Sequence, residues 1–226
     1  MLEDENRRLI MDRLGGAVDE LVADLYSDTA GGVRVVQEAE ITSRLCQRLE
    51  DRLDNSQAGE YVFRVIAQSL PDRGPNSMEK LFGADLFLSI SLDGADGFDK
   101  GIFIQAKYDR NINRTELKDA CRRMEAIAER QGVYVWVYEP DGVKVLSSHQ
   151  VGQMKQNSLT GIQPRTMTGF TGRILDCYAG SRAWGIPSTG DRRKLVAERL
   201  LEARASNLLD IKLKKIEAND RNARSP

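Results

Sequence analysis

The stretch from Gly83 to Lys107 constrains the fold of this chain more than any other part of the sequence. Two apolar runs, GADLFLSI and KGIFIQAK, flank a turn that is rich in glycine and aspartate. Apolar runs of this length on either side of such a turn are typical of β-strands. The stretch therefore predicts two neighbouring strands joined by a tight turn.

Polar side chains interrupt these runs where the two strands would adjoin. Because side chains alternate between the faces of a strand, Gln105 and Lys107 share one face, opposite an apolar face. Asp85 opens the preceding strand, and a hairpin would bring its carboxylate beside Gln105. An acid, an amide oxygen and an amine at adjoining strand ends can hold a hard cation and stabilise a developing oxyanion. We therefore expect a functional site formed by these three residues.

The same residues resemble a known family signature. The motifs GAD, which ends at Asp85, and QAK, from Gln105 to Lys107, resemble the PD-(D/E)xK signature of the restriction-endonuclease-like nucleases, in its QxK variant. The resemblance extends to the order of elements from about Val33 to Val145. It implies an α/β fold with an αβββαβ core and a mixed central sheet, flanked by N- and C-terminal helices.

The resemblance also implies a chemistry. In such nucleases Mg²⁺ (or Mn²⁺) is held by residues that correspond to Asp85, the amide oxygen of Gln105 and the backbone carbonyl of Ala106. Lys107 would position or help to deprotonate the attacking water and stabilise the oxyanion. The implied activity is hydrolysis of phosphodiester bonds in DNA, with double-stranded DNA as the expected substrate, and proteins of this kind often serve in restriction or anti-phage defence.

A glutamate from the first core helix often completes the metal site in the resembling family. The helix expected over Arg34–Leu53 carries Glu38 and Glu40 in its first half. Glu40 is the first choice as catalytic residue and metal ligand, and Glu38 the second. Taken alone, either glutamate is typical of a solvated helix start, where the helix dipole favours an acid, and only the downstream motif favours Glu40 as a ligand. Since Gln105 replaces the acid common in the family, the site would hold metal more weakly or rely on Glu40.

The remaining pattern predicts alternating helices and strands. Leu2–Tyr26 has helical spacing that Gly15-Gly16 interrupts, and the helix from about Arg192 to Glu217 is long and rich in leucine. Between them we expect strands over Tyr61–Leu70, Gly132–Tyr138 and Val143–Leu146, and helices over Arg114–Arg130 and Phe170–Tyr178.

These elements predict three regions. They are an N-terminal helical extension (1–30), a nuclease-like core (31–187) and a long C-terminal helix with a frayed tail (188–226). The terminal helices either pack on their own domain or join subunits, and the second alternative predicts a homo-oligomer.

Basic residues near the expected site are candidate contacts to nucleic acid. Arg114, Lys118 and Arg122 step by four along one helix side, and Arg73 lies in a Pro/Gly/Asn loop. They are interpreted either as a ridge that contacts phosphates or, for the helix, as a solvated face balanced by neighbouring acids.

Composition excludes several other classes. The net charge of −1 means that any contact with nucleic acid must come from a local patch, and the single histidine, His149, argues against histidine-rich metal centres. Three distant cysteines and the lack of a long apolar run predict a cytoplasmic protein without membrane contact. The acids of the turn at Asp93, Asp96 and Asp99 recur every three residues, which does not match a calcium loop.

Two other functions stay open. The first is a nuclease-like module that binds nucleic acid or protein without cutting, because the acid at position 105 is missing. The second is a structural or regulatory protein that acts through its terminal helices.

Overall fold

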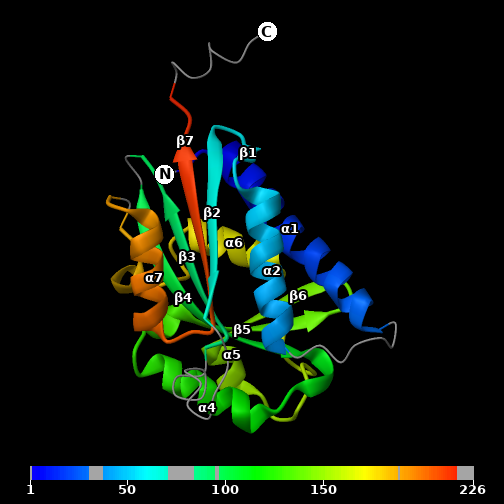
Figure 1. The fold of residues 1–226 in the computed structure, drawn as a ribbon. Coiled ribbons are helices and arrows are strands. Elements are labelled where there is room, and N and C mark those ends of the chain that lie inside the picture. Colours follow the sequence, from blue (N-terminus) through cyan, green and yellow to red (C-terminus); the bar gives the residue numbers. More distant parts are fainter. Residues whose placement is uncertain (1, 31–37, 71–83, 95–96, 188, 218–226) are drawn as a thin grey trace.

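The chain forms one seven-stranded sheet with helices on both sides, seen in a computed structural model (Figure 1). The structure describes residues 2–30, 38–70, 84–94, 97–187 and 189–217. In chain order the helices and strands are α1 (Asp4–Ala30), α2 (Glu38–Leu53), β1 (Gln57–Ala58), β2 (Tyr61–Ser69), β3 (Leu86–Leu92), β4 (Phe98–Tyr108), α4 (Arg114–Glu125), β5 (Val133–Glu139), β6 (Gly142–Ser147), α5 (Ser148–Gln153), α6 (Met167–Leu175), α7 (Arg192–Ala203) and β7 (Asn207–Lys215). Short 3₁₀ turns, η1 to η3, cover Asp109–Asn111, Arg130–Gly132 and Arg182–Trp184.

The sheet is mixed. Its strand order is β1-β2-β7-β3-β4-β5-β6, so the last strand of the chain lies between β2 and β3 (Figure 1). β7 runs antiparallel to β2 and parallel to β3, while β3 and β4 are antiparallel, β4 and β5 parallel, and β5 and β6 antiparallel. The prediction of an α/β fold with a mixed central sheet between helices is therefore confirmed.

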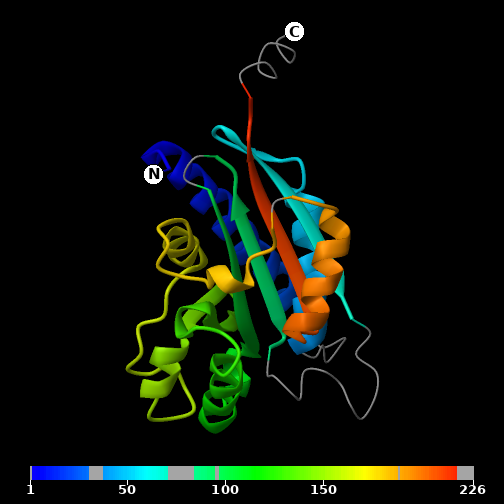
Figure 2. The ribbon, with the colours of Figure 1, turned by 90° about the vertical axis from the view of Figure 1, so that its left-hand side faces the viewer.

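Each face of the sheet carries its own apolar core. Ile102 and Ile104 of β4 pack in the cluster that includes α1, α2 and α6. Phe103, on the opposite face, packs in the cluster that includes α4, α5 and α7. Figure 2 shows α7, α4 and α5 in front of the sheet and α1 behind it. The alternation of side chains along the strands therefore divides the core into two layers.

The N-terminal helix belongs to the first of these layers. α1 runs unbroken through Gly15-Gly16, so the predicted interruption is wrong. A Cβ atom on Gly15 would lie 2.6 Å from the Cα of Thr168, which shows that glycine lets α1 approach α6 closely. The apolar stripe of α1, including Ile10, Val18 and Val22, is buried within its own chain. No helix among the described residues combines the length and the apolar character needed to cross a membrane.

The predicted long C-terminal helix is wrong beyond Ala203. α7 ends there, Arg204 takes a left-handed conformation (φ 49°), and the chain returns as β7. The segment NLLDIKLKK places Leu209, Ile211 and Leu213 on one face of the sheet, with the period of two that a strand requires. Residues 207–215 therefore belong to the central sheet and not to a separate C-terminal helix. Self-association through the terminal helices stays a prediction.

Candidate functional site at one end of the sheet

The hairpin brings the three predicted polar residues to one end of the sheet. Leu86 of β3 pairs with Ile104 of β4, and the backbone N–H of Asp85 donates a 2.9 Å hydrogen bond to the carbonyl of Ile104. This register sets Asp85 opposite Gln105. Lys107 follows on the same face of β4 and is half-buried.

The Asp85 carboxylate is held by the strand that faces it. Asp85 is 2% exposed and Gln105 6%. One oxygen, Oδ2, accepts hydrogen bonds from the Gln105 amide nitrogen and, at 2.6 Å, from the backbone N–H of Ala106. The same amide nitrogen lies 3.3 Å from the Ala106 carbonyl oxygen. Three of the predicted metal ligands, Asp85, Gln105 and Ala106, are thus in direct contact.

Two residues that the sequence did not point to anchor the Asp85 backbone. Asn207, the first residue of β7, donates from its backbone N–H (3.2 Å) and from its side-chain amide (3.0 Å) to the Asp85 carbonyl. Ser69, at the end of β2, donates to Oδ1 of Asn207 at 2.7 Å. A helical interpretation of 207–215 hid Asn207, and only the pairing of β7 with β3 gives it this place.

The two glutamates of α2 lie on different sides of the helix. Glu40 is exposed and forms an ion pair with Arg44, and no described contact joins it to the Asp85 cluster. Glu38 accepts a 2.7 Å hydrogen bond from the Asn111 side chain. One turn after Glu38, the Thr42 hydroxyl lies 2.8 Å from the Tyr138 hydroxyl on β5. Glu38 therefore lies on the sheet-facing side of α2. Its spacing of three and seven residues from the apolar Ile41 and Leu45 could have indicated this side from the sequence.

Tyr138 adds a neutral hydrogen-bonding group near the cluster. It is fully buried at the end of β5. Burial raises the pKa of its hydroxyl, the hydrogen bond with Thr42 opposes this, and the nearby Asp85 carboxylate adds a smaller increase. The Tyr138 hydroxyl therefore keeps its proton at all ordinary pH values.

The predicted nucleic-acid contacts of α4 are engaged with the chain itself. The Arg114 guanidinium donates to the Lys155 carbonyl at 3.0 Å, and the Lys118 ammonium to the Met154 carbonyl at 3.1 Å. Arg122 forms an ion pair of 2.8 Å with Asp119. Arg73 lies outside the described residues. Arg114 and Lys118 therefore hold α4 against the segment after α5, whereas Arg122 is paired within α4. Lys118 and Arg122 also border a cavity described below.

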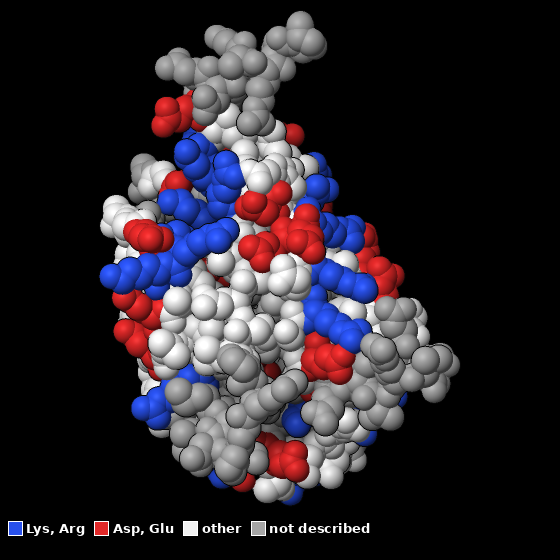
Figure 3. All heavy atoms as spheres, in the orientation of Figure 1, with Lys and Arg blue, Asp and Glu red and all other residues white. Residues whose placement is uncertain are grey.

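The surface seen from the direction of Figure 1 carries charges of both signs. Figure 3 shows basic and acidic side chains next to one another over its upper half, in keeping with the net charge of −1. Elsewhere along the chain, ion pairs such as Lys212–Asp93 (3.2 Å) and Lys215–Glu60 (3.5 Å) neutralise part of the basic charge. This face does not present one continuous basic surface.

Within the described part of the chain, no three histidine, cysteine or acidic side chains are grouped so that they could hold a metal ion. The candidate site instead offers one carboxylate, one side-chain amide and one backbone carbonyl.

Comparison of the chain with protein-family models, curated proteins and solved structures gave no match.

Proposed function

We propose that this protein is a metal-dependent endonuclease that hydrolyses phosphodiester bonds in double-stranded DNA. The observation that carries the proposal is the contact between Asp85, Gln105 and Ala106 at one sheet end, with Lys107 next on the same face. An acid, an amide and a lysine in this arrangement have no evident task in packing, since such groups are usually kept at the surface.

The order of elements supports the proposal. Apart from the two-residue strand β1 between α2 and β2, the elements α2, β2, β3, β4, α4 and β5 have the order αβββαβ. The antiparallel pair β3–β4 and the parallel pair β4–β5 lie in one mixed sheet with α2 and α4 on opposite faces. This agrees with a restriction-endonuclease-like core in which β7 is an added strand between β2 and β3.

The donor set fits a hard divalent cation. Mg²⁺ in proteins is commonly bound through one or two carboxylates, with waters and substrate phosphates filling the other positions. Asp85 supplies one carboxylate, Gln105 and Ala106 supply neutral oxygens, and Glu38 is a half-buried acid on the sheet-facing side of α2. A bound ion of this kind lowers the pKa of a water and screens phosphate charge.

The residues of the chain have distinct tasks in this proposal. The Ala106 N–H and the Gln105 amide fix the orientation of the Asp85 carboxylate, and Asn207 fixes its backbone. Lys107 orients the attacking water and stabilises the negative charge that develops on the phosphate oxygens. Preorganised groups of this type act without rearranging during the reaction, which is the main source of their effect.

A second candidate function is binding without cleavage. One observation favours it: the Asp85 carboxylate already has two hydrogen-bond donors within the protein. A carboxylate that is satisfied in this way is stable without a cation. In that case the protein would be a module that binds nucleic acid or another protein without cutting it.

Plasmid nicking separates the two functions. Supercoiled plasmid is incubated with the wild-type protein in Mg²⁺, in Mn²⁺ and in EDTA, and with the variants Lys107→Ala and Lys194→Ala. The matched control Lys194 is an exposed lysine on α7. We expect metal-dependent nicking that falls about 100-fold or more in Lys107→Ala and is unchanged in Lys194→Ala.

Thermal unfolding of each variant checks that it is folded. A folded wild type that binds DNA but is inert with both metal ions favours the binding module. Nicking that survives in Lys107→Ala shows that the activity does not depend on this site.

A further inference from the structure

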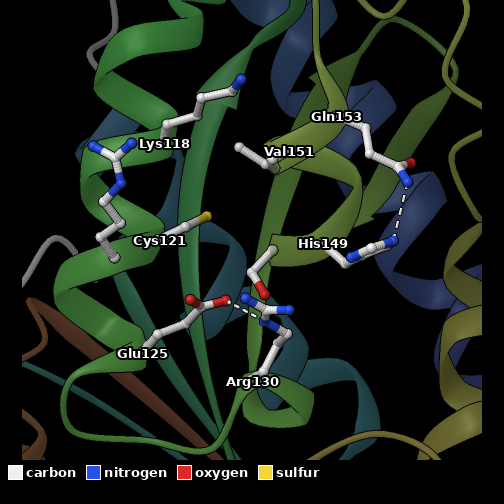
Figure 4. Close-up of a pocket in the computed structure, with 10 residues that line it drawn as sticks. Lys118, Cys121, Glu125, Arg130, His149, Val151 and Gln153 are labelled. Carbon is white, nitrogen blue, oxygen red and sulfur yellow. Dashed lines mark hydrogen bonds and ion pairs between the residues drawn. The ribbon is translucent and has the colours of Figure 1, made fainter.

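A separate cavity of about 320 Å³ lies between α4 and α5 (Figure 4). Figure 4 shows Lys118 and Cys121 pointing from α4 toward α5 and Arg130 on the turn η2, while His149 and Gln153 on α5 point toward each other. The cavity shares no lining residue with the Asp85 cluster. Its lining consists of Lys118, Cys121, Arg122, Glu125, Arg130, Ser148, His149, Val151, Gly152 and Gln153.

The charge of the lining is predominantly positive. Among the described lining residues, Lys118, Arg122 and Arg130 carry positive charges and Glu125 is the only acid. Arg122 also forms an ion pair with Asp119, which does not line the cavity. Glu125 forms an ion pair of 3.1 Å with Arg130, which places the negative charge beside that one guanidinium. A concave site with an excess of basic groups concentrates anions.

A residue that lines this cavity also carries a buried hydroxyl. Ser148 lines it and is only 5% exposed, yet its Oγ has no hydrogen-bond partner among the described residues. The preceding Ser147 is different, because its hydroxyl caps α5 together with Gln150. Buried polar groups nearly always have partners, so a ligand oxygen would satisfy this hydroxyl once the side chains that cover it turn aside.

The floor of the cavity is uncharged. Val151 and Cys121 are buried there, and burial raises the pKa of the Cys121 thiol to about 12. An apolar floor below a basic rim suits a ligand with an organic part and an anionic group. The volume lies at the small end of the range for small-molecule sites, which runs from roughly 300 to 1,000 Å³.

We propose that the cavity between α4 and α5 binds a phosphomonoester. Its phosphate contacts Lys118, Arg122 and Arg130 and accepts a hydrogen bond from the Ser148 hydroxyl. Its organic part packs on Cys121 and Val151. The source of the group is a free nucleotide or the 5′-phosphate at the end of a nucleic-acid strand. The inference goes beyond the proposed nuclease activity and does not depend on it.

Calorimetric titration tests the proposal at constant ionic strength. The probes are adenosine 5′-monophosphate, adenosine and inorganic phosphate, added to the wild type and to Ser148→Ala, Arg130→Gln, Glu125→Gln and Arg123→Gln. Arg123 is exposed on α4 and does not line the cavity, so it is the matched control. We expect the monophosphate to bind more tightly than phosphate, and adenosine not to bind.

The variants should change affinity in both directions. Ser148→Ala and Arg130→Gln should weaken binding by about tenfold, the scale of one lost hydrogen bond to a charged group. Glu125→Gln should tighten binding, because it removes the only negative charge among the described residues of the lining. A gain of affinity cannot come from a misfolded variant. Arg123→Gln should bind as the wild type does.

His149 provides a second measurement, because it is the only histidine of the chain. In untagged protein its imidazole gives a unique NMR signal, which should shift with adenosine 5′-monophosphate and not with adenosine. If the phosphate belongs to the end of a nucleic-acid strand, a 5′-phosphorylated oligonucleotide should bind better than its 5′-hydroxyl form. A free nucleotide source predicts no such difference.

Two outcomes overturn the proposal. The first is a folded wild type that at millimolar concentration binds neither adenosine 5′-monophosphate, nor inorganic phosphate, nor the 5′-phosphorylated oligonucleotide. The second is an affinity for the monophosphate that is the same in Ser148→Ala, Arg130→Gln and the wild type, or that falls equally in Arg123→Gln.

Discussion

The carboxylate of Glu38 accepts a 2.7 Å hydrogen bond from the side chain of Asn111. This contact joins the first turn of α2 to the turn η1, which follows the strand that carries Gln105 and Lys107. Glu40, two residues later, lies on the other side of the helix with Arg44. Of the two glutamates, Glu38 is therefore the one that contacts the turn after β4.

Glu38→Gln should reduce metal-dependent nicking by about tenfold or more and shift its Mg²⁺ dependence to higher concentration. The reason is the loss of a second negative charge from a site in which Gln105 is neutral. Glu40→Gln is the matched control and should stay within about twofold of the wild type. A larger loss in Glu40→Gln than in Glu38→Gln would restore Glu40 as the helix ligand.

Gln105→Glu should make the site more dependent on metal. A second carboxylate beside Asp85 repels it, which should lower stability in EDTA by about 1 kcal/mol or more. Mg²⁺ should then raise the melting temperature of this variant more than that of the wild type. Gln156→Glu, at an exposed position, is the control. If Mg²⁺ stabilises the Gln105→Glu variant no more than the control, this sheet end does not bind the cation.

The adjacent glycines of α1 should respond oppositely to alanine. Gly15→Ala places a Cβ atom 2.6 Å from the Thr168 backbone and should destabilise the fold by about 1–3 kcal/mol, because α1 and α6 must move apart. Around a Cβ atom on Gly16 there is open space, so Gly16→Ala should stabilise by up to about 1 kcal/mol through helix propensity. Urea unfolding measures both, and equal effects would contradict the close approach of the helices.

The ion pair between Arg192 and Asp210 should be essential for holding α7 against β7. It is bidentate, with N–O distances of 2.6 Å and 2.7 Å, and the Arg192 guanidinium also donates to the Ser91 hydroxyl at 3.0 Å. Arg192→Met should cost about 3–5 kcal/mol, because it leaves the buried Asp210 charge without its partner.

The double variant Arg192→Met/Asp210→Leu should recover most of this loss, and the exposed Arg193→Met should change stability by less than about 0.5 kcal/mol. Chemical unfolding of the wild type, Arg192→Met, Asp210→Leu and the double variant gives the coupling energy. Additive losses in the double variant would show that the pair is not coupled.

Lys100 should make stability depend on alkaline pH. It is 1% exposed, its ammonium donates to the Ile174 carbonyl at 2.7 Å, and burial lowers its pKa from 10.5. Between the lowered folded pKa and the unfolded value, the unfolded chain binds more protons than the folded chain. Stability therefore rises as the pH increases through this interval, and the buried charge is unfavourable below it.

Lys100→Met should raise stability at pH 7 by about 1 kcal/mol and abolish the alkaline rise. The Ile174 carbonyl keeps a partner in this variant, because the Cys177 N–H also donates to it at 3.1 Å. Unfolding free energies between neutral and alkaline pH check both effects. A variant that is less stable at pH 7, with the same pH slope as the wild type, would contradict the assignment to Lys100.

The local pattern of the sequence determined the β3–β4 hairpin and the gathering of Asp85, Gln105 and Ala106. Alternation along a strand and a short turn specify which side chains share a face, and these are interactions between residues near in sequence. The predicted strands of β2, β5 and β6 agree with the structure within two residues for the same reason.

Only the tertiary structure decided the place of β7, the role of Asn207 and the choice between Glu38 and Glu40. The leucines of residues 192–217 have helical spacing in the part that forms α7 and strand spacing in the part that forms β7. Pairing with β2 and β3, more than a hundred residues away, selects the strand for the second part. Hydrogen bonds between distant strands leave no local period in the sequence. Packing of α2 across the core likewise decides which of its glutamates lies on the side that faces the sheet.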